Sequence, residues 1–309
     1  MKEEQINLDE TTLSIDLSDA TQAVKESRFE DALSLLKVLL KEHPNHIDIL
    51  YLSAVSTRFL KKFDDSRKHI EHLLFNAPDM GRAYQELGHL NRDMGNEEKA
   101  VMHYRQACEL NPALPSSWNY LYQYFQKIEN EPAAVHALEQ IKKLQTLPGL
   151  LLFIEQILNE GRLGLAETKC RAFLKENPTH TYAMSLLAEI ANRFGYFDDA
   201  EFLLQKAVEF KPQDGDLRLK YASILRKKQK FAQTTEQVNI LCDQFPNNLN
   251  YQAQKASDVM QGGDHAKAIT MFDDILEKNP YNFSTLTSKG HAQKTLGSTD
   301  QAVSYTHLR

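Results

Sequence analysis

The chain has 309 residues, of which 42% are hydrophobic and 25% charged, and its formal net charge is −6. This balance is typical of a folded globular protein, and the negative charge argues against a dedicated nucleic-acid binder. No stretch approaches the roughly 18 consecutive apolar residues of a membrane-spanning helix, so a membrane is not an expected partner. Because of the negative charge, nucleic acid is not an expected partner either.

The N-terminal sequence, MKEEQINLDE, is acidic where a secretory signal is basic and then apolar. The cysteines Cys108, Cys170 and Cys242 are odd in number and far apart in the sequence. This spacing fits reduced, buried thiols better than a disulfide framework or a zinc site. We therefore expect a cytoplasmic protein.

Prolines that follow helical runs recur at a constant interval. They are Pro44, Pro78, Pro112, Pro178, Pro212, Pro246 and Pro280, spaced 34 residues apart except for one interval of 66. The longer interval holds two repeats, one of them trimmed. Repeats then begin near residues 13, 47, 81, 115, 147, 181, 215, 249 and 283, which gives about nine, the last incomplete. Residues 1–12 form a polar lead-in.

The third repeat, GRAYQELGHLNRDMGNEEKAVMHYRQACELNPAL, shows why the period exists. Apolar residues recur at helical spacing until Gly95 interrupts the pattern. Ala100, Tyr104 and Ala107 then form the apolar stripe of a second helix. Pro112 ends the repeat because proline cannot continue a helix. Each repeat is thus predicted to be an antiparallel helical hairpin.

Small residues mark two places where the helices of a hairpin are expected to approach closely. The first-helix set is Ala20, Ala54, Gly88, Ala188, Ala222 and Ala256. The second-helix set is Ala32, Ser66, Ala100, Ala200, Thr234 and Ala268. Glycines are expected at the turn between the helices, where positive φ is required. These are Gly95, Gly161, Gly195, Gly263 and Gly297.

The pattern YxxLG…AxxxY…P in the repeat that begins at Gly81 resembles the tetratricopeptide repeat, and related patterns run from Leu13 to about Ala302. The resemblance implies an all-α, right-handed superhelical solenoid of antiparallel helix hairpins. Short helices are marginal alone, so stacking of neighbouring hairpins must supply stability. It also implies a concave surface, lined by the first helices, that holds extended peptides.

The fourth and fifth repeats depart from the rule. Tyr122 and Ile154 occupy the place where other repeats have a small residue, and the run QTLPGLLLFIEQIL replaces the usual closing pair. Two interpretations remain open. The segment is either a looser part of the superhelix with apolar infill, or a partner-binding apolar surface around Leu150–Phe153.

The first helices carry the candidate binding residues. Outward places hold Tyr51, Gln85, His89, Asn119 and Tyr182. A cation recurs near the helix C-termini at Lys25, Arg58, Arg92, Lys127, Arg193, Arg226 with Lys227, and Lys294. One interpretation is a basic stripe along the concave face that recruits an acidic peptide or tail. The other is that cations simply stabilise helix C-termini, by about 0.3–1 kcal/mol each.

Motifs for catalysis are absent, so we expect no catalytic, cofactor-binding or metal-binding residue in this chain. No glycine-rich phosphate loop is present. His69 and His72 are spaced to share a metal, but an exposed helix face explains them better. The acidic pairs Asp64-Asp65 and Asp198-Asp199 are read as helix-capping residues, and Trp118 as a core residue.

Several segments show a more specific resemblance, among them GLAETKCRAFLKENPTH, DDAEFLLQKAVEFKP and GHAQKTLG. They are similar to the N-terminal repeat region of bacterial tetratricopeptide-containing sulfotransferases. The resemblance implies a downstream α/β catalytic domain that binds phosphoadenosine phosphosulfate and transfers sulfate to a hydroxyl. This chain is then the binding scaffold of a longer enzyme. The alternative is a stand-alone adaptor for assembling protein complexes.

The C-terminal residues lose the repeat register after Ala302. Thr306 and Arg309 stand where apolar or small residues are expected. The string VSYTHLR also resembles one reading frame of a transposon-end sequencing adapter. We therefore interpret residues 303–309 as a non-native truncation artefact and exclude them from the predicted fold.

Overall fold

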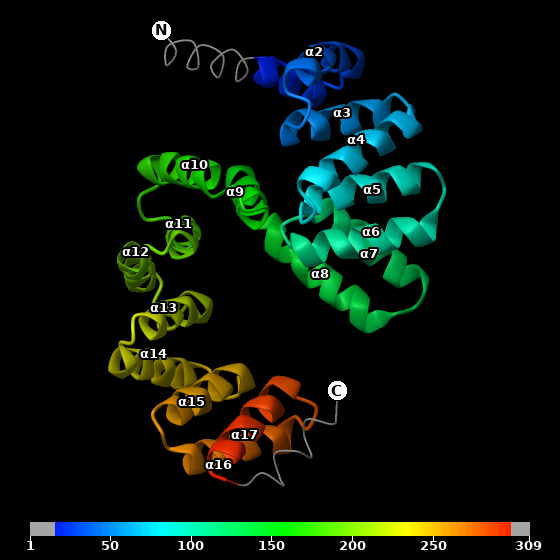
Figure 1. Cartoon of the computed structure of the whole chain (residues 1–309). Coiled ribbons are helices and arrows are strands. Elements are labelled where there is room, and N and C mark those ends of the chain that lie inside the picture. Colours follow the sequence, from blue (N-terminus) through cyan, green and yellow to red (C-terminus); the bar gives the residue numbers. More distant parts are fainter. Residues whose placement is uncertain (1–15, 298–309) are drawn as a thin grey trace. The chain divides into compact units, whose positions relative to one another are not determined.

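The computed structural model describes residues 16–297, and every regular element in that range is a helix (Figure 1). Residues 16–25 are helical. The helices that follow are α2 (Phe29–Glu42), α3 (Ile47–Phe59), α4 (Phe63–Asn76), α5 (Gly81–Asp93), α6 (Glu97–Leu110), α7 (Pro115–Lys127), α8 (Glu131–Gln145), α9 (Gly149–Asn159), α10 (Leu163–Glu176), α11 (Thr181–Phe194), α12 (Phe197–Phe210), α13 (Gly215–Lys227), α14 (Phe231–Gln244), α15 (Leu249–Gln261), α16 (His265–Lys278) and α17 (Phe283–Thr295). The predicted all-α hairpin architecture is confirmed.

The turns inside the hairpins share one backbone conformation. All five predicted turn glycines have positive φ, between 75° and 93°. Repeats without glycine reach the same conformation with another residue. These are Ser27, Lys61, Glu129 and Gln229, with φ between 55° and 60°. Glycine adopts this region without strain, whereas the other four pay a steric cost.

The predicted small residues lie in the core. Every member of both sets is buried, and none of the alanines is more than 1% exposed. Gly88 of α5 shows the reason. A Cβ atom at this position would lie 2.7 Å from the Tyr104 ring of α6, so glycine lets these two helices approach. Tyr104 is itself fully buried.

The chain divides into two compact units, residues 1–162 and 163–309. Unit 1 contains the hairpins α3/α4, α5/α6 and α7/α8, together with α2 and α9. Unit 2 contains α10, the hairpins α11/α12, α13/α14 and α15/α16, and α17. Within each unit the second helix of a hairpin generally packs on the first helix of the next, as α4 does on α5 and α12 on α13, but α8 does not pack extensively on α9.

The fifth predicted repeat, which starts near residue 147, has its first helix from Gly149, with Pro148 as the N-cap residue. The division between the units also falls inside this repeat, after Arg162, so α9 and α10 belong to different units. The sequence did not predict this division.

Three sequence-based expectations fall partly or wholly outside the described residues. They concern the polar lead-in 1–12, the register at Ala302 and the segment 303–309. Of the ninth repeat, only the first helix, α17, is described.

The acidic pairs are not helix caps in the strict sense. Lys62 and Tyr196 occupy the N-cap positions of α4 and α12, and neither forms a side-chain cap. The paired aspartates lie in the first turn, where a negative charge favours the helix dipole. Asp198 also forms an ion pair with Lys228.

The cysteines and the tryptophan largely match expectation. Cys108 and Cys170 are free and buried, whereas Cys242 is free and half-buried. Trp118 packs against the core of the third and fourth hairpins but is only partly buried. Its indole Nε1 donates a 2.8 Å hydrogen bond to the carbonyl of Pro112.

Candidate functional site

Most of the predicted binding residues lie on the first helices of unit 1. We call this set the first-helix face. It comprises Tyr51 and Arg58 of α3, Gln85, His89 and Arg92 of α5, and Asn119 and Lys127 of α7, together with Gln123, which occupies an outward position on α7. Arg92, Asn119 and Lys127 are exposed, Tyr51, Gln85 and His89 are half-buried, and Arg58 is buried.

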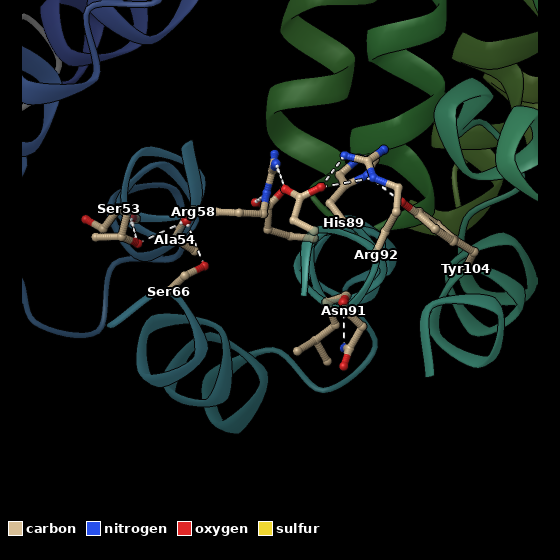
Figure 2. Close-up of polar contacts among 12 residues, drawn as sticks. Ser53, Ala54, Arg58, Ser66, His89, Asn91, Arg92 and Tyr104 are labelled. Atoms are coloured by element: carbon tan, nitrogen blue, oxygen red, sulfur yellow. Dashed lines mark hydrogen bonds and ion pairs between the residues drawn. The ribbon is translucent and has the colours of Figure 1, made fainter. Parts of the chain in front are cut away.

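Arg58 is part of a buried ion-pair network between α3 and α5. Its guanidinium pairs with Glu86 and donates a 2.7 Å hydrogen bond to Asp93. Arg92 reaches the other oxygen of Asp93 at 2.8 Å, so both arginines converge on this carboxylate (Figure 2). Arg58 is 6% exposed and Glu86 2% exposed, so this pair lies in the core and not on an open surface.

The network shifts the pKa values of its two carboxylates, Glu86 and Asp93, in opposite directions. Burial raises the pKa of Glu86, although the charge of Arg58 opposes the shift. Partial burial also disfavours the charged form of Asp93, but the hydrogen bonds from Arg58 and Arg92 outweigh it and lower its pKa. Asp93 is therefore held as an anion between two cations.

His89 lies next to this network and contacts the buried residue Tyr104. Its Nδ1 atom lies 2.6 Å from the hydroxyl oxygen of Tyr104, and the two groups share a hydrogen bond (Figure 2). Burial, with the charges of Arg58 and Arg92, lowers the pKa of His89 to about 3. His89 is thus neutral at physiological pH and adds no positive charge to the face.

Four further predicted cations, Lys127, Arg193, Arg226 and Lys227, have internal partners. Lys127 donates hydrogen bonds of 2.8 Å to the carboxylate of Glu97. In unit 2, Arg193 pairs with Glu189, Arg226 with Asp258, and Lys227 with the amide oxygen of Asn192. Tyr182 on α11 is half-buried. These cations occupy the last turns of their helices and are paired internally, so the helix-end interpretation explains their positions. Acidic-peptide binding by them stays a prediction.

A second polar site lies at the N-terminal ends of α3 and α5, where the end of α9 contacts them. Arg82 of α5 holds the Glu160 carboxylate through two hydrogen bonds of 2.6 Å each. Arg162 holds the carboxylate of Asp48 on α3 through two bonds of 2.7 Å each. We call these two bidentate ion pairs the α9 clasp.

The Arg82 side of the α9 clasp is well buried. Glu160 is 2% exposed and Arg82 13% exposed. The Arg82 guanidinium also lies 5.0 Å from the ring centroid of Tyr51. Burial by itself lowers the pKa of Arg82, but the bonds to Glu160 outweigh this and raise it. Burial raises the pKa of Tyr51 to about 12.

Three hydrogen bonds extend this contact to the α6–α7 loop. The Gln156 side chain donates to the carbonyl of Ala113 at 2.7 Å, and Asn111 donates to the carbonyl of Gln156 at 3.0 Å. Asn159 donates to the side-chain oxygen of Asn111 at 3.2 Å. Sequence analysis did not identify the α9 clasp. The available signal was the opposite charges of Asp48 and Arg82 at the same place in successive repeats.

The α7/α8 hairpin has an open face. In the described part of the chain, α8 is the exception to the rule that a second helix packs extensively on the next first helix. Leu138 of α8 is half-buried, whereas residues at the same place in other hairpins are at most 3% exposed. These are Leu36, Ile70, Tyr104, Leu204, Val238 and Phe272. A hollow of about 440 Å³ on this face is lined by Tyr122, Phe125, Gln126, Glu129, Glu131, Ala134, Val135 and Leu138.

The apolar segment around Leu150–Phe153 is mostly not open surface. Leu151 is buried, Leu150 is 42% exposed, and the two residues between Leu151 and Ile154 are half-buried. Ile154, at the place of a small residue, is fully buried. The infill interpretation therefore accounts for most of this segment.

Unit 2 has a smaller hollow of about 220 Å³ with an aromatic rim. It is lined by Glu167, Arg171, Leu187, Ile190, Ala191, Phe194, Tyr196, Asp199, Phe202 and Leu203. Glu167 and Arg171 form an ion pair with each other at 2.8 Å. The polar groups at this hollow do not form a catalytic arrangement.

Within residues 16–297, no helix is both long and apolar enough to cross a membrane. The same range contains no cluster of three or more His, Cys, Asp or Glu side chains suited to a metal ion. His72, considered above as a metal ligand, shares a 2.8 Å hydrogen bond with Asn45.

Stacked hairpins with small residues between their helices define a helical-repeat protein. The family model described as tetratricopeptide repeat matches residues 81–114, which contain α5 and α6. The match identifies the α5/α6 hairpin as similar to one tetratricopeptide repeat. No curated protein matches this chain.

Two solved structures align with this chain at low identity. The structure titled "Crystal structure of MamA" aligns with a TM-score of 0.43 and 18% identity, over 49% of this chain and 89% of that one. The structure titled "Crystal structure of APC/C hetero-tetramer Cut9-Hcn1" aligns with a TM-score of 0.42 and 16% identity. That alignment covers 94% of this chain, which spans 60% of the length of the other.

Proposed function

We propose that this chain is a protein-binding scaffold and that the exposed end of the first-helix face, on α5 and α7, contacts the partner. One observation carries the proposal: exposed polar side chains, Arg92, Asn119 and Gln123, stand on helices fixed by a buried core. Rigid mounting lowers the entropic cost of binding. The partner is a peptide or protein segment, and its acidic character is part of the proposal.

Selection of ligands from a random peptide library tests this function. Peptides selected on the full chain are measured against the variant Arg92→Ala/Asn119→Ala/Gln123→Ala. The matched control is Glu139→Ala/Lys142→Ala, which changes exposed residues of α8. We expect the first variant to lose at least tenfold in affinity, or about 1.4 kcal/mol, and the control to bind as the native chain does. Equal loss in both variants would reject the assignment.

From the sequence resemblance alone, we further propose that the scaffold belongs to a longer, cytoplasmic sulfotransferase. In that protein a downstream α/β domain binds phosphoadenosine phosphosulfate, and the repeats hold the acceptor or a partner. The contiguous gene past Ala302 tests this proposal, together with a sulfate-transfer assay on its product. A downstream frame that encodes no phosphate-binding domain rejects it and favours the stand-alone adaptor.

A further inference from the structure

We propose that α9 is an internal ligand of unit 1, and that the surface under it binds a partner helix of the same chemistry. That chemistry is an apolar helical stripe followed by Glu-x-Arg, which this chain presents as Glu160-Gly161-Arg162. The inference rests on the proposed binding function. It adds a second surface, distinct from the exposed end of the first-helix face, and names the partner that fits it.

The receptor for this motif is built into the first helices. Asp48 and Arg82 each lie in the first turn of a first helix, at the same place in successive repeats. Neighbouring hairpins therefore present one acidic and one basic group side by side. The Arg82 guanidinium lies over the ring of Tyr51, 5.0 Å from its centroid, and forms a cation–π contact with it.

The bidentate geometry makes the site selective. A guanidinium and a carboxylate bound through two parallel hydrogen bonds fix both direction and register. Asp48 requires a guanidinium and Arg82 requires a carboxylate, so the ligand must carry its acid before its base. Exchanging the two ligand charges places like charges at both ends of the receptor.

The position of α9 outside the hairpin stack makes it replaceable. Its end is held to α3, α5 and the α6–α7 loop by side-chain hydrogen bonds and ion pairs. Meanwhile α8 has no extensive contact with a following first helix, and its Leu138 face stays open. The buried side of α9 carries Leu151, Ile154, Ile157 and Leu158, and the hollow on the α7/α8 hairpin, also in unit 1, is lined in part by apolar side chains. Binding of a partner helix would therefore replace the contact of α9 with α3 and α5, and α9 could then pack on the open face of the α7/α8 hairpin.

A peptide of residues 149–162, GLLLFIEQILNEGR, with a fluorescent label and a solubilising tail, tests the inference by anisotropy. The full chain is compared with the variant Glu160→Ala/Arg162→Ala, which removes both ion pairs of the α9 clasp and keeps Asp48 and Arg82; we expect it to release α9. We expect at least tenfold tighter binding by the variant, because occupancy of about 90% by the internal ligand weakens apparent affinity tenfold. Adding Asp48→Ala and Arg82→Ala to the variant abolishes the gain.

The matched control peptide has the same composition and carries Glu160→Arg with Arg162→Glu. We expect it to bind the released variant at least tenfold more weakly than the natural peptide. Equal binding of the two peptides, or equal binding of the natural peptide to both chains, overturns the inference. Library peptides that still depend on Arg92 and Asn119 would then leave the proposed scaffold function standing.

A second measurement covers the case in which the released variant loses helical circular dichroism. The native chain is saturated with each peptide, and hydrogen exchange is followed in the chain's own residues 149–162. The natural peptide is expected to speed exchange there by displacing α9, and the control peptide to leave it unchanged. Unchanged exchange with the natural peptide overturns the inference.

Discussion

Arg58 shows how one residue can look like a binding group in sequence and act as a structural one. Arg58 occupies the position near the helix C-terminus where other repeats also have a cation. It is nevertheless the one buried residue of the first-helix face. Its two carboxylate partners both lie on α5, in the next repeat. Neighbouring hairpins are therefore joined by charge as well as by apolar packing.

Replacing Arg58 should destabilise unit 1 strongly. Arg58→Met leaves Glu86 buried without its cation, so we expect a loss of about 3–5 kcal/mol in the free energy of unfolding. Urea unfolding followed by fluorescence of Trp118, the single tryptophan, reports on unit 1. The control Lys68→Ala removes an exposed pair with Asp65 and should cost about 0.5 kcal/mol or less. Similar losses in both variants would contradict the prediction.

The buried His89 predicts acid sensitivity. Its pKa is about 3 in the folded chain and about 6.5 when unfolded, so the unfolded state binds more protons between these values. Stability is therefore complete above pH 6.5 and falls as the pH drops toward 3. Between pH 7 and pH 5 this amounts to about 2 kcal/mol.

The variant His89→Gln tests the origin of this effect. Urea unfolding at pH 7 and pH 5 should show a smaller pH-dependent loss for the variant than for the native chain. His46, His69 and His103 also have lowered pKa values through burial, and they contribute equally in both proteins. An unchanged pH dependence in the variant would assign the sensitivity to those residues.

Among the helices, the spacing within each hairpin depends on the sizes of two facing residues. One lies on the first helix and is small, and the other lies on the second helix and is larger. Gly88 faces Tyr104, whereas other hairpins place alanine in the same core as a smaller partner, as with Ala54 and Ile70. Both places are visible in the sequence because the repeat compares each hairpin with its neighbours. Their sizes compensate so that the helices keep their separation.

This compensation predicts a coupled pair of substitutions. Gly88→Ala places a Cβ 2.7 Å from the Tyr104 ring and should cost about 1–3 kcal/mol in overpacking, partly offset by about 1 kcal/mol of helix propensity. In a Tyr104→Leu background the same change should be neutral or stabilising, because it reproduces the alanine and leucine that pack in one core as Ala188 and Leu204. A double-mutant cycle on unfolding free energies measures this coupling. Additive effects would contradict it.

At the scale of the whole chain, the regular stacking stops at the end of the fourth hairpin. Unit 1 closes after Arg162, and α9 is held at the N-terminal ends of α3 and α5. Within unit 1, the α7/α8 hairpin therefore has one face that α9 does not cover extensively. Each unit keeps its own sequence of packed hairpins.

The open face of the α7/α8 hairpin predicts that a charged substitution costs less stability there than at the equivalent position of a covered hairpin. Leu138→Glu should change the unfolding free energy by no more than about 1 kcal/mol, because water reaches this side chain. Ile70→Glu, at the same place in a covered hairpin, buries an unpaired charge and should cost more than about 4 kcal/mol. Circular dichroism during urea unfolding measures both. A comparable loss at Leu138 would show that this face is covered.

The repeating features of this protein can be predicted from its sequence. The 34-residue period, the hairpin turns and the small residues follow from local rules: glycine tolerates positive φ, proline ends helices, and apolar side chains recur at helical spacing. Each rule acts within one hairpin or between neighbours. Nine occurrences in one chain therefore made the pattern readable without a structure.

The contacts between distant polar groups, in contrast, follow from the packing of the helices. Arg82 and Glu160 are 78 residues apart, and Asp48 and Arg162 are 114 apart. No periodic rule links such positions, because their contact depends on where α9 lies in unit 1. The burial of Arg58 and the neutrality of His89 also depend on surrounding helices that remove water from them. Local chemistry fixed the hairpins, and long-range packing fixed the clasp, the open face and the division between the units.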